Sequence, residues 1–305
     1  MLKNGKLINP EVRIETTNKC QLHCVICPRE KMERAKSVMC YGLFCNLADQ
    51  ARELGANTIS LFGYGEPLTD SGLEDKVEYV TSLGLSTFIT TNAGLLTQER
   101  SENLIYAGLK NIRFSFHGIA PLTYEKVHKG ISWLTAWGNF YNFILTNRRH
   151  GHSCQVHVSV IPMHGESVTD ISNTWERYSD FLEIWKPHNW AGGRKYRESN
   201  RVKNTCGRPF SGPVQIQSDG TVIPCCFITN SEIVLGDTTD GSIESILTNE
   251  PYAKLREAHL TGSLNGYVCA ACDQLNQELE SPLLYSTRDT TREIGKTSTC
   301  KITVQ

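Results

Sequence analysis

Three closely spaced cysteines near the start of this sequence are the residues best suited to chemistry. Cys20, Cys24 and Cys27 have the spacing C-x3-C-x2-C within the run NKCQLHCVICPR. Cysteine thiolates are the usual ligands of iron–sulfur clusters, and a [4Fe–4S] cluster normally takes four of them. Three local thiolates would leave one iron open, as a catalytic metal site keeps one position free. The run therefore predicts a cluster with an open coordination position.

A zinc site is the alternative for these three cysteines. C-x2-C is a common zinc spacing, and the second ligand pair normally follows within about 12–20 residues. Cys40 and Cys45 lie 13 and 18 positions after Cys27, so this alternative stays open. Their x4 spacing and the helix-like pattern around them make it the weaker interpretation. Disulfide pairing would require an oxidising compartment.

A second group of cysteines lies in the last third of the chain. The spacing C-x13-G-x4-C is followed by C-x2-C, and the four cysteines are Cys206, Cys225, Cys269 and Cys272. Residues 214–217 and 221–223 alternate around Asp219-Gly220, which predicts a β-hairpin that brings the first two cysteines to one end. Four thiolates complete either one closed cluster or one zinc site, and the spacing alone does not decide between them.

Cys226 follows Cys225 directly. We interpret it as a spare thiol. The alternatives are an exchange of ligand with Cys225 or a thiol that donates a hydrogen atom.

Composition limits the partners and the location. The chain has 305 residues, with 31 basic and 32 acidic ones, so no global field predicts nucleic-acid or membrane binding. The start of the chain has no signal peptide, and no apolar run approaches the roughly 20 residues of a membrane span. Twelve cysteines without a secretory signal indicate a reducing compartment, so we expect a cytoplasmic protein.

Alternating strand and helix patterns must position these cysteines. The predicted strands cover residues 12–16, 58–62, 86–90, 111–116 and 155–161. The predicted helices cover residues 41–54, 73–83, 97–107 and 133–149. Such alternation is typical of right-handed βαβ units and a parallel sheet, whose ligands bind at the carboxyl ends of the strands.

The cysteine run and its surroundings resemble the radical S-adenosylmethionine (radical SAM) family. The run FGYGEP at 62–67 is similar to the family's Gly-Gly-Glu motif, with Tyr64 in place of the first glycine and with Gly65 and Glu66 retained. The resemblance implies that the open iron of a [4Fe–4S] cluster chelates SAM. An electron from the cluster then splits SAM to a 5′-deoxyadenosyl radical, which abstracts hydrogen from a substrate.

The same resemblance implies a SAM pocket. The backbone at Gly65 and Glu66 would receive the methionyl amino group, and Ile26 would lie against the adenine. Asn92 belongs to a Thr-Asn-Gly-like segment, and Ser115 would bind a ribose hydroxyl or the methionyl carboxylate. His117 stands where many members have Asp. It contacts SAM, acts on the substrate as a proton carrier, or is an ordinary buried histidine.

The second cysteine group resembles the SPASM/Twitch extension of radical SAM enzymes. The residues from 273 to 281 lack the further cysteines of a full SPASM domain. The resemblance therefore implies one auxiliary [4Fe–4S] cluster, as in the group that includes 2-deoxy-scyllo-inosamine dehydrogenase.

These features predict an α/β fold, and the resemblance implies a partial (β/α)6 TIM-like barrel followed by a small cysteine-rich β-hairpin and helix extension. The predicted domains are a radical SAM core at 10–190 and an auxiliary cluster domain at 191–281. A polar tail at 282–305 follows, in which we expect little regular structure.

The expected reaction is oxidative modification of a small molecule or a peptide, with the auxiliary cluster as electron acceptor. The alternatives are a peptide epimerase or cross-linking maturase, and a catalytically silent iron–sulfur or zinc protein. The chain starts almost at the first strand, so we expect no N-terminal leader-peptide-binding domain, which speaks against the peptide maturase unless a separate partner protein supplies that function. The resemblance implies a flavodoxin or ferredoxin as electron donor.

Overall fold

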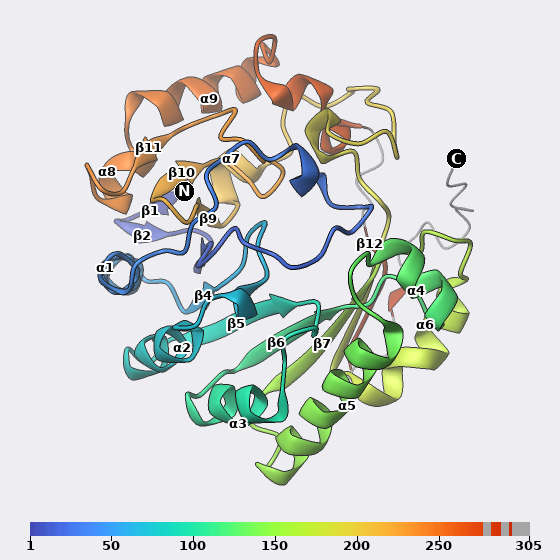
Figure 1. The fold of residues 1–305 in the computed structure, drawn as a ribbon. Helices are drawn as coiled ribbons and strands as arrows, with labels where there is room; N and C mark the ends of the chain where they lie inside the picture. The colour runs from blue at the N-terminus through green and yellow to red at the C-terminus, as the bar shows by residue number, and fades with distance from the viewer. Residues whose placement is uncertain (277–281, 288–292, 295–305) are drawn as a thin grey trace. The chain divides into compact units, whose positions relative to one another are not determined.

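The computed structural model describes residues 1–276, 282–287 and 293–294 (Figure 1). The chain forms two compact units that do not follow chain order. The first unit comprises Met1–Cys20, Pro28–Thr87 and Asn189–Leu279, and the second comprises Gln21–Cys27, Phe88–His188 and Glu280–Gln305. The predicted core at 10–190 therefore contributes residues to both units.

The first unit begins with two strands of the parallel sheet. Strands β3 (Glu11–Ile14) and β4 (Thr58–Ser60) pair in parallel, with Val12 opposite Ile59. Helix α1 (Tyr41–Glu53) lies between them in the chain, and α2 (Leu73–Ser82) follows β4. The apolar residues of α1 recur at helical spacing and are buried, which is why this segment is a helix. Both predicted helices are confirmed.

The cysteine-rich segment of the first unit contains the predicted hairpin. Strands β9 (Val214–Ile216) and β10 (Thr221–Ile223) are antiparallel, and Gly220 between them has a φ of 95°. That left-handed conformation favours glycine, as the turn requires. Strand β9 also pairs in parallel with β3, and β10 pairs with β11 (Gly236–Asp237). The hairpin therefore extends the sheet that carries β3.

Short helices complete this unit. They are α7 (Arg208–Ser211), α8 (Ile243–Leu247) and α9 (Glu250–Thr261), the last two drawn in orange in Figure 1. Its 3-10 turns are Pro28–Lys31, Pro67–Thr69, Trp190–Gly192, Val268–Ala271 and Asp273–Leu275. Strands β1 (Leu2–Lys3) and β2 (Lys6–Leu7) form a separate hairpin.

The second unit continues the βα alternation. Strand β5 (Ser86–Thr91) enters it from the first unit, and β6 (Asn111–Ser115), β7 (Gln155–Val160) and β8 (Phe181–Trp185) follow in parallel order. Its helices are α3 (Gln98–Tyr106), α4 (Pro121–Val127), α5 (Trp133–Arg149) and α6 (Val168–Trp175), with a 3-10 turn at Glu176–Tyr178. Phe114 of β6 packs against Phe140 and Phe143 of α5. The predicted α/β class is confirmed, whereas β8, α4 and α6 were not predicted.

The expectation of little regular structure after residue 281 was wrong in part. Strand β12 (Pro282–Thr287) pairs antiparallel with β8, and β13 (Glu293–Ile294) pairs with β12. The run Leu-Leu-Tyr in β12 favours extended structure, and the edge of β8 offers unpaired backbone groups. Cys300 lies outside the described residues.

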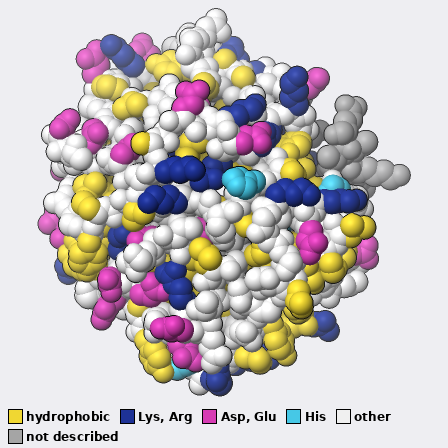
Figure 2. Space-filling view, viewed as in Figure 1, with side chains coloured by type: hydrophobic (Ala, Val, Ile, Leu, Met, Phe, Trp, Pro, Cys, Tyr) yellow, Lys and Arg dark blue, Asp and Glu magenta, His cyan; other side chains and the backbone are white. Residues whose placement is uncertain are grey.

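Charges of both signs are interspersed on the face drawn in Figure 2, in keeping with the near-neutral composition. Among the described residues, no helix is both long and apolar enough to cross a membrane.

Candidate functional site

The cysteine loop of the second unit is held by backbone hydrogen bonds to the last residue of α4 and to the segment just after it. The N–H groups of His23 and Val25 donate to the carbonyl oxygens of Lys129 and Val127, at 2.9 and 3.0 Å. Within the loop, the N–H of Cys27 donates to the carbonyl of Cys24. Cys24 and Cys27 are half-buried. The loop therefore has a fixed backbone that presents these two thiols.

Cys20 belongs to the first unit, at the end of its first segment, and is also half-buried. None of the cysteines in the described ranges forms a disulfide. Cys40 precedes α1 and Cys45 lies within it, as the helix-like pattern indicated.

Asn92, a proposed SAM contact, lies beside the cysteine loop. Its Oδ1 accepts a hydrogen bond from Gln21 Nε2 at 2.9 Å and another from the N–H of Gly94. Ile26 is buried, and Ser115 is the last residue of β6, opposite Ser159 of β7. The structure thus brings Asn92 to the loop, while Ser115 lies at the carboxyl end of its strand.

Two stacked histidines lie next to Cys24 of the loop. Sγ of Cys24 is 3.5 Å from Nδ1 of His128, and the stacked rings of His128 and His117 have a centroid distance of 5.0 Å. Nδ1 of His117 accepts a hydrogen bond from the N–H of Ile161. Burial, with a smaller effect of Arg113, lowers the pKa of His117 to about 3. His117 is therefore neutral at physiological pH, and it is a buried hydrogen-bonded residue whether or not it also contacts SAM.

The Gly65-Glu66 segment of the first unit packs on the chain that leads to Cys20. A Cβ atom on Gly65 would lie 2.1 Å from the carbonyl oxygen of Thr17, so only glycine fits there. The N–H of Glu66 donates to the carbonyl of Lys19 at 2.8 Å. The Glu66 carboxylate is buried and accepts from the N–H of Leu68, which caps the 3-10 turn that follows.

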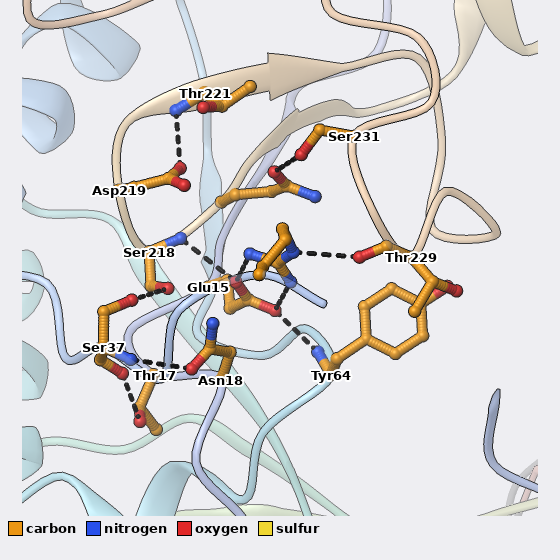
Figure 3. Close-up of polar contacts among 12 residues, drawn as sticks. Glu15, Thr17, Asn18, Ser37, Tyr64, Ser218, Asp219, Thr221, Thr229 and Ser231 are labelled. Carbon is orange, nitrogen blue, oxygen red and sulfur yellow. Dashed lines mark hydrogen bonds and ion pairs between the residues drawn. The ribbon is translucent and has the colours of Figure 1, made fainter. Parts of the chain in front are cut away.

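A buried ion pair lies next to this segment and was not predicted from the sequence. Both carboxylate oxygens of Glu15 bind Arg34, at 2.9 and 3.0 Å, and both side chains are almost fully buried. Figure 3 shows that Glu15 also accepts hydrogen bonds from the N–H of Tyr64 and from the N–H of Ser218. Arg34 donates further to the carbonyl of Thr229. One carboxylate thus joins the Tyr64 loop to the β9–β10 turn.

Tyr64 makes a second connection to the cysteine-rich segment. Its hydroxyl donates to the carbonyl oxygen of Cys226 at 2.7 Å. Its ring packs on that of Trp190 with a centroid distance of 5.9 Å, and the Trp190 ring packs on that of Phe227 with a centroid distance of 5.7 Å. A glycine at position 64, as in the family motif, would make none of these side-chain contacts. Tyr64, which departs from the family motif, therefore supports the chain next to Cys225.

The four cysteines of the second group gather in the first unit. Cys206 and Cys269 pack against the core formed by Ala258, Leu264 and Leu275. Burial, reinforced by the Cys206 thiol, raises the pKa of Cys269 to about 11. Burial likewise raises the pKa of Cys272 to about 12, with Cys206 and Cys269 adding to the effect.

Burial also raises the pKa of Cys225 well above its usual value, and Cys226 and Cys269 add to this. Arg208 lies among these thiols. Its burial works to lower the pKa of the guanidinium, yet the negative charge available on the surrounding cysteines raises it. Those cysteines are Cys226, Cys225, Cys206 and Cys272. All four predicted ligands therefore interact electrostatically within one region of this unit.

Over the described residues, no group of three or more His, Cys, Asp or Glu side chains is arranged to hold one metal ion. Four thiolates complete the coordination of a zinc ion or of a [4Fe–4S] cluster. The chemistry of these four thiols is therefore compatible with either group.

A polar group on the sheet of the second unit was also missed. Glu183 of β8 lies 3.4 Å from Arg113 Nη1 and 3.5 Å from His157 Nδ1, and accepts a hydrogen bond from Trp185 Nε1. Burial works to raise the pKa of Glu183, but His157, Arg113 and Trp185 together hold it below its usual value. The available signal was the presence of polar residues within mostly apolar strand segments, because buried charges need partners.

Comparison with known proteins identifies the class. The sequence model of the radical SAM superfamily matches residues 14–176, more than half of the chain, so the chain belongs to this superfamily. A second model, SPASM, described as an iron-sulfur cluster-binding domain, matches residues 206–273. The protein is thus an enzyme of the class that uses a [4Fe–4S] cluster with SAM and carries an auxiliary iron–sulfur domain. Both predicted resemblances are confirmed, and the zinc interpretation of the second group is set aside.

Individual relatives are more distant. A probable GTP 3′,8-cyclase of Methanothermobacter marburgensis is 33% identical over 114 residues, which are 37% of this chain and 37% of that protein. The chain therefore spans well under half of that relative.

Two solved structures share the fold. BtrN in complex with AdoMet and 2-DOIA has a TM-score of 0.63 and 19% identity, over 90% of this chain and 98% of BtrN. SuiB of Streptococcus suis, bound to the precursor peptide SuiA, has a TM-score of 0.67 and 14% identity, over 88% of this chain and 70% of SuiB. At these identities the likeness establishes the fold alone.

Proposed function

We propose that this radical SAM enzyme carries out a net oxidation of a small molecule or a peptide. Cys20, Cys24 and Cys27 hold the cluster that binds SAM. A second, closed cluster is held by Cys206, Cys225, Cys269 and Cys272. The observation that carries this proposal is the gathering of these four thiols in one region around Arg208.

The bound groups supply two kinds of chemistry: hydrogen-atom abstraction with SAM at the first cluster, and acceptance of the remaining electron by the second. The protein binds and orients the reactants. Gly65 lets its loop pack closely on the backbone at Thr17, and the Glu66 carboxylate caps the 3-10 turn that follows by accepting a hydrogen bond from the N–H of Leu68. Ile26, Asn92 and Ser115 are the proposed SAM contacts of the second unit.

Arg113, His157 and Glu183 are proposed as substrate contacts. The three side chains form one polar group on neighbouring strands, with His157 and Glu183 buried and Arg113 half-buried. Their hydrogen-bonding capacity suits a hydroxyl or amino substituent better than an apolar substrate. BtrN with 2-DOIA and SuiB with its precursor peptide illustrate the two substrate classes open to this fold.

An epimerase or cross-linking peptide maturase is the second candidate function. The observation that favours it is Cys226, whose thiol interacts with Arg208 in the same region as the auxiliary cysteines. A thiol that returns a hydrogen atom to the substrate radical would give epimerisation in place of oxidation. His117 remains a weaker candidate for a substrate contact.

A flavodoxin or ferredoxin is the proposed electron donor, and the cytoplasm is the proposed location. Both follow from the need for a low-potential electron and for reduced cysteines.

Iron content of cysteine variants tests the proposal. The anaerobically reconstituted protein should hold about eight irons, and the Cys20→Ala/Cys24→Ala/Cys27→Ala variant about four. The Cys225→Ala/Cys269→Ala variant should also hold about four but keep SAM cleavage. Stoichiometric zinc in the second site would remove the electron acceptor and overturn the oxidation. A Cys226→Ala variant that cleaves SAM but no longer turns over would favour epimerisation.

A further inference from the structure

We propose that His128 donates an N–H···S hydrogen bond to the Cys24 thiolate and thereby raises the reduction potential of the cluster that binds SAM. The inference rests on the proposed role of Cys24 as a ligand of that cluster. It concerns a positioning and tuning residue, because His128 acts through Cys24.

The hydrogen bonds around His128 fix the position of its proton. The backbone N–H of His117 points at Nε2 of His128 at 3.1 Å. A ring nitrogen that accepts a hydrogen bond carries no proton, and a neutral imidazole has its single proton on the other nitrogen. The proton of His128 therefore resides on Nδ1. Nδ1 is the atom that lies 3.5 Å from Cys24 Sγ, so the ring donates to the sulfur.

The surroundings hold the His128 ring in this orientation. His128 is 2% exposed and follows the last residue of α4. Its ring stacks on Tyr124 at 4.3 Å and on His117 at 5.0 Å. The residues on either side of it in the chain, Val127 and Lys129, accept the backbone hydrogen bonds of the cysteine loop. Backbone hydrogen bonds thus hold the chain around His128 next to the cysteine loop, in addition to the contact between the two side chains.

The expected consequence follows from charge. The reduced cluster is more negative than the oxidised one, so a hydrogen-bond donor at a ligand sulfur stabilises the reduced form more. Hydrogen bonds to the sulfurs are among the features that set cluster potentials. Outer partners that orient a metal ligand also strengthen metal binding.

A redox titration of three variants tests the inference. It uses the Cys225→Ala/Cys269→Ala background, so that only the first cluster gives a signal, and follows the reduced cluster by EPR. His128→Phe keeps a ring for the stack but removes the donor. We expect a roughly tenfold lower ratio of reduced to oxidised cluster at a fixed potential, which is about 59 mV for a one-electron couple.

His128→Asn offers an amide N–H near the position of Nδ1 and should restore much of the potential. Tyr124→Phe is the matched control, because it keeps the stacked ring and leaves the His128 donor in place; its potential should equal that of the background. An unchanged potential in His128→Phe, with the cluster intact, would overturn the inference.

The proton position is tested separately, without any cluster. In the apo-protein with ¹⁵N-labelled histidine, two-bond ¹H–¹⁵N correlation spectra should show His128 protonated at Nδ1. Protonation at Nε2 would overturn the inference even if His128→Phe failed to take up iron. If Cys24→Ala instead retained the first cluster, the proposed role of Cys24 would fail, and that outcome is distinct from an unchanged potential in His128→Phe.

Discussion

The two groups of cysteines differ in how the chain assembles them. Cys20, Cys24 and Cys27 are neighbours in the sequence, and backbone hydrogen bonds of His23 and Val25 hold their loop. Cys206, Cys225, Cys269 and Cys272 are distant in the sequence and are gathered by the β9–β10 hairpin, a 3-10 turn and a small apolar core.

The difference matches the two kinds of site. A loop with three thiols leaves a position for an outside ligand, whereas four thiols close the coordination of a cluster. Burial raises the pKa values of Cys269 and Cys272, two of the thiols in the second group. Local spacing thus suffices to build an open site, while a closed one needs tertiary structure around it.

Removing one proposed ligand from each group is the strongest test of the difference between the two groups. Cys24→Ala should reduce 5′-deoxyadenosine formation to background, since three thiolates are the minimum for the first cluster. Cys269→Ala should leave SAM cleavage intact while product formation stops. Anaerobic assays that quantify both products check this. Equal loss of SAM cleavage in the two variants would show that the groups are not independent.

Removing the Glu15 charge should affect both groups, because Glu15 bonds to the Tyr64 loop and to the turn before β10. Glu15→Gln leaves the buried Arg34 without its counter-charge, and breaking such a pair costs about 3–5 kcal/mol. Urea unfolding of the apo-protein measures this cost. Glu250→Gln, which breaks the exposed pair with Lys254, is the control and should leave stability unchanged. A similar stability for both variants would contradict the account.

A side chain at Gly65 should affect the first group most. The Cβ of Gly65→Ala would meet the backbone oxygens of Thr17 and Lys19, so the loop must move, at a cost of about 1–3 kcal/mol. SAM affinity, measured by equilibrium binding to the reconstituted protein, should fall while the auxiliary iron remains. Gly42→Ala in α1 is the matched control, since a Cβ there meets nothing within 4 Å. Unaltered SAM affinity in Gly65→Ala would argue against the proposed SAM loop.

The smallest expected effect concerns the second group. Tyr64→Phe keeps the ring contact with Trp190 but loses the hydrogen bond to the carbonyl of Cys226, worth about 0.5–1.5 kcal/mol. We expect faster loss of the auxiliary iron to a chelator, with the first cluster unaffected. Tyr106→Phe, at a side chain that is 72% exposed, should behave as wild type. Identical rates in the two variants would remove the proposed support of the Cys225 loop.

The sequence predicted the parts of this molecule that depend on local pattern. Regular alternation revealed β5 and β6, and helical spacing revealed α1 and α5. The parallel pairing of β9 with β3 joins segments about 200 residues apart, and no local signal reports such a partner. The C-terminal strand β12 was missed because polar residues dominate the sequence after it and obscured a short run that favours extended structure.

The site was predictable to a similar extent. Spacing singled out the cysteines as candidate ligands, and the motif around Gly65 singled out its loop as a candidate SAM contact. The hydrogen-bond partners were not predictable: His128 reaches Cys24, and Tyr64 reaches Cys226, only through the fold. A charged residue directly after a buried apolar one, as Glu15 is after Ile14, was the available hint of a buried network.

The most direct test of an open first site and a closed second site is the response of each cluster to SAM. EPR spectra of the reduced protein are recorded with and without SAM in the Cys225→Ala/Cys269→Ala and the Cys20→Ala/Cys24→Ala/Cys27→Ala backgrounds. We predict that SAM changes the spectrum only in the first background, where the open iron remains. A SAM-dependent change in the second background would contradict it.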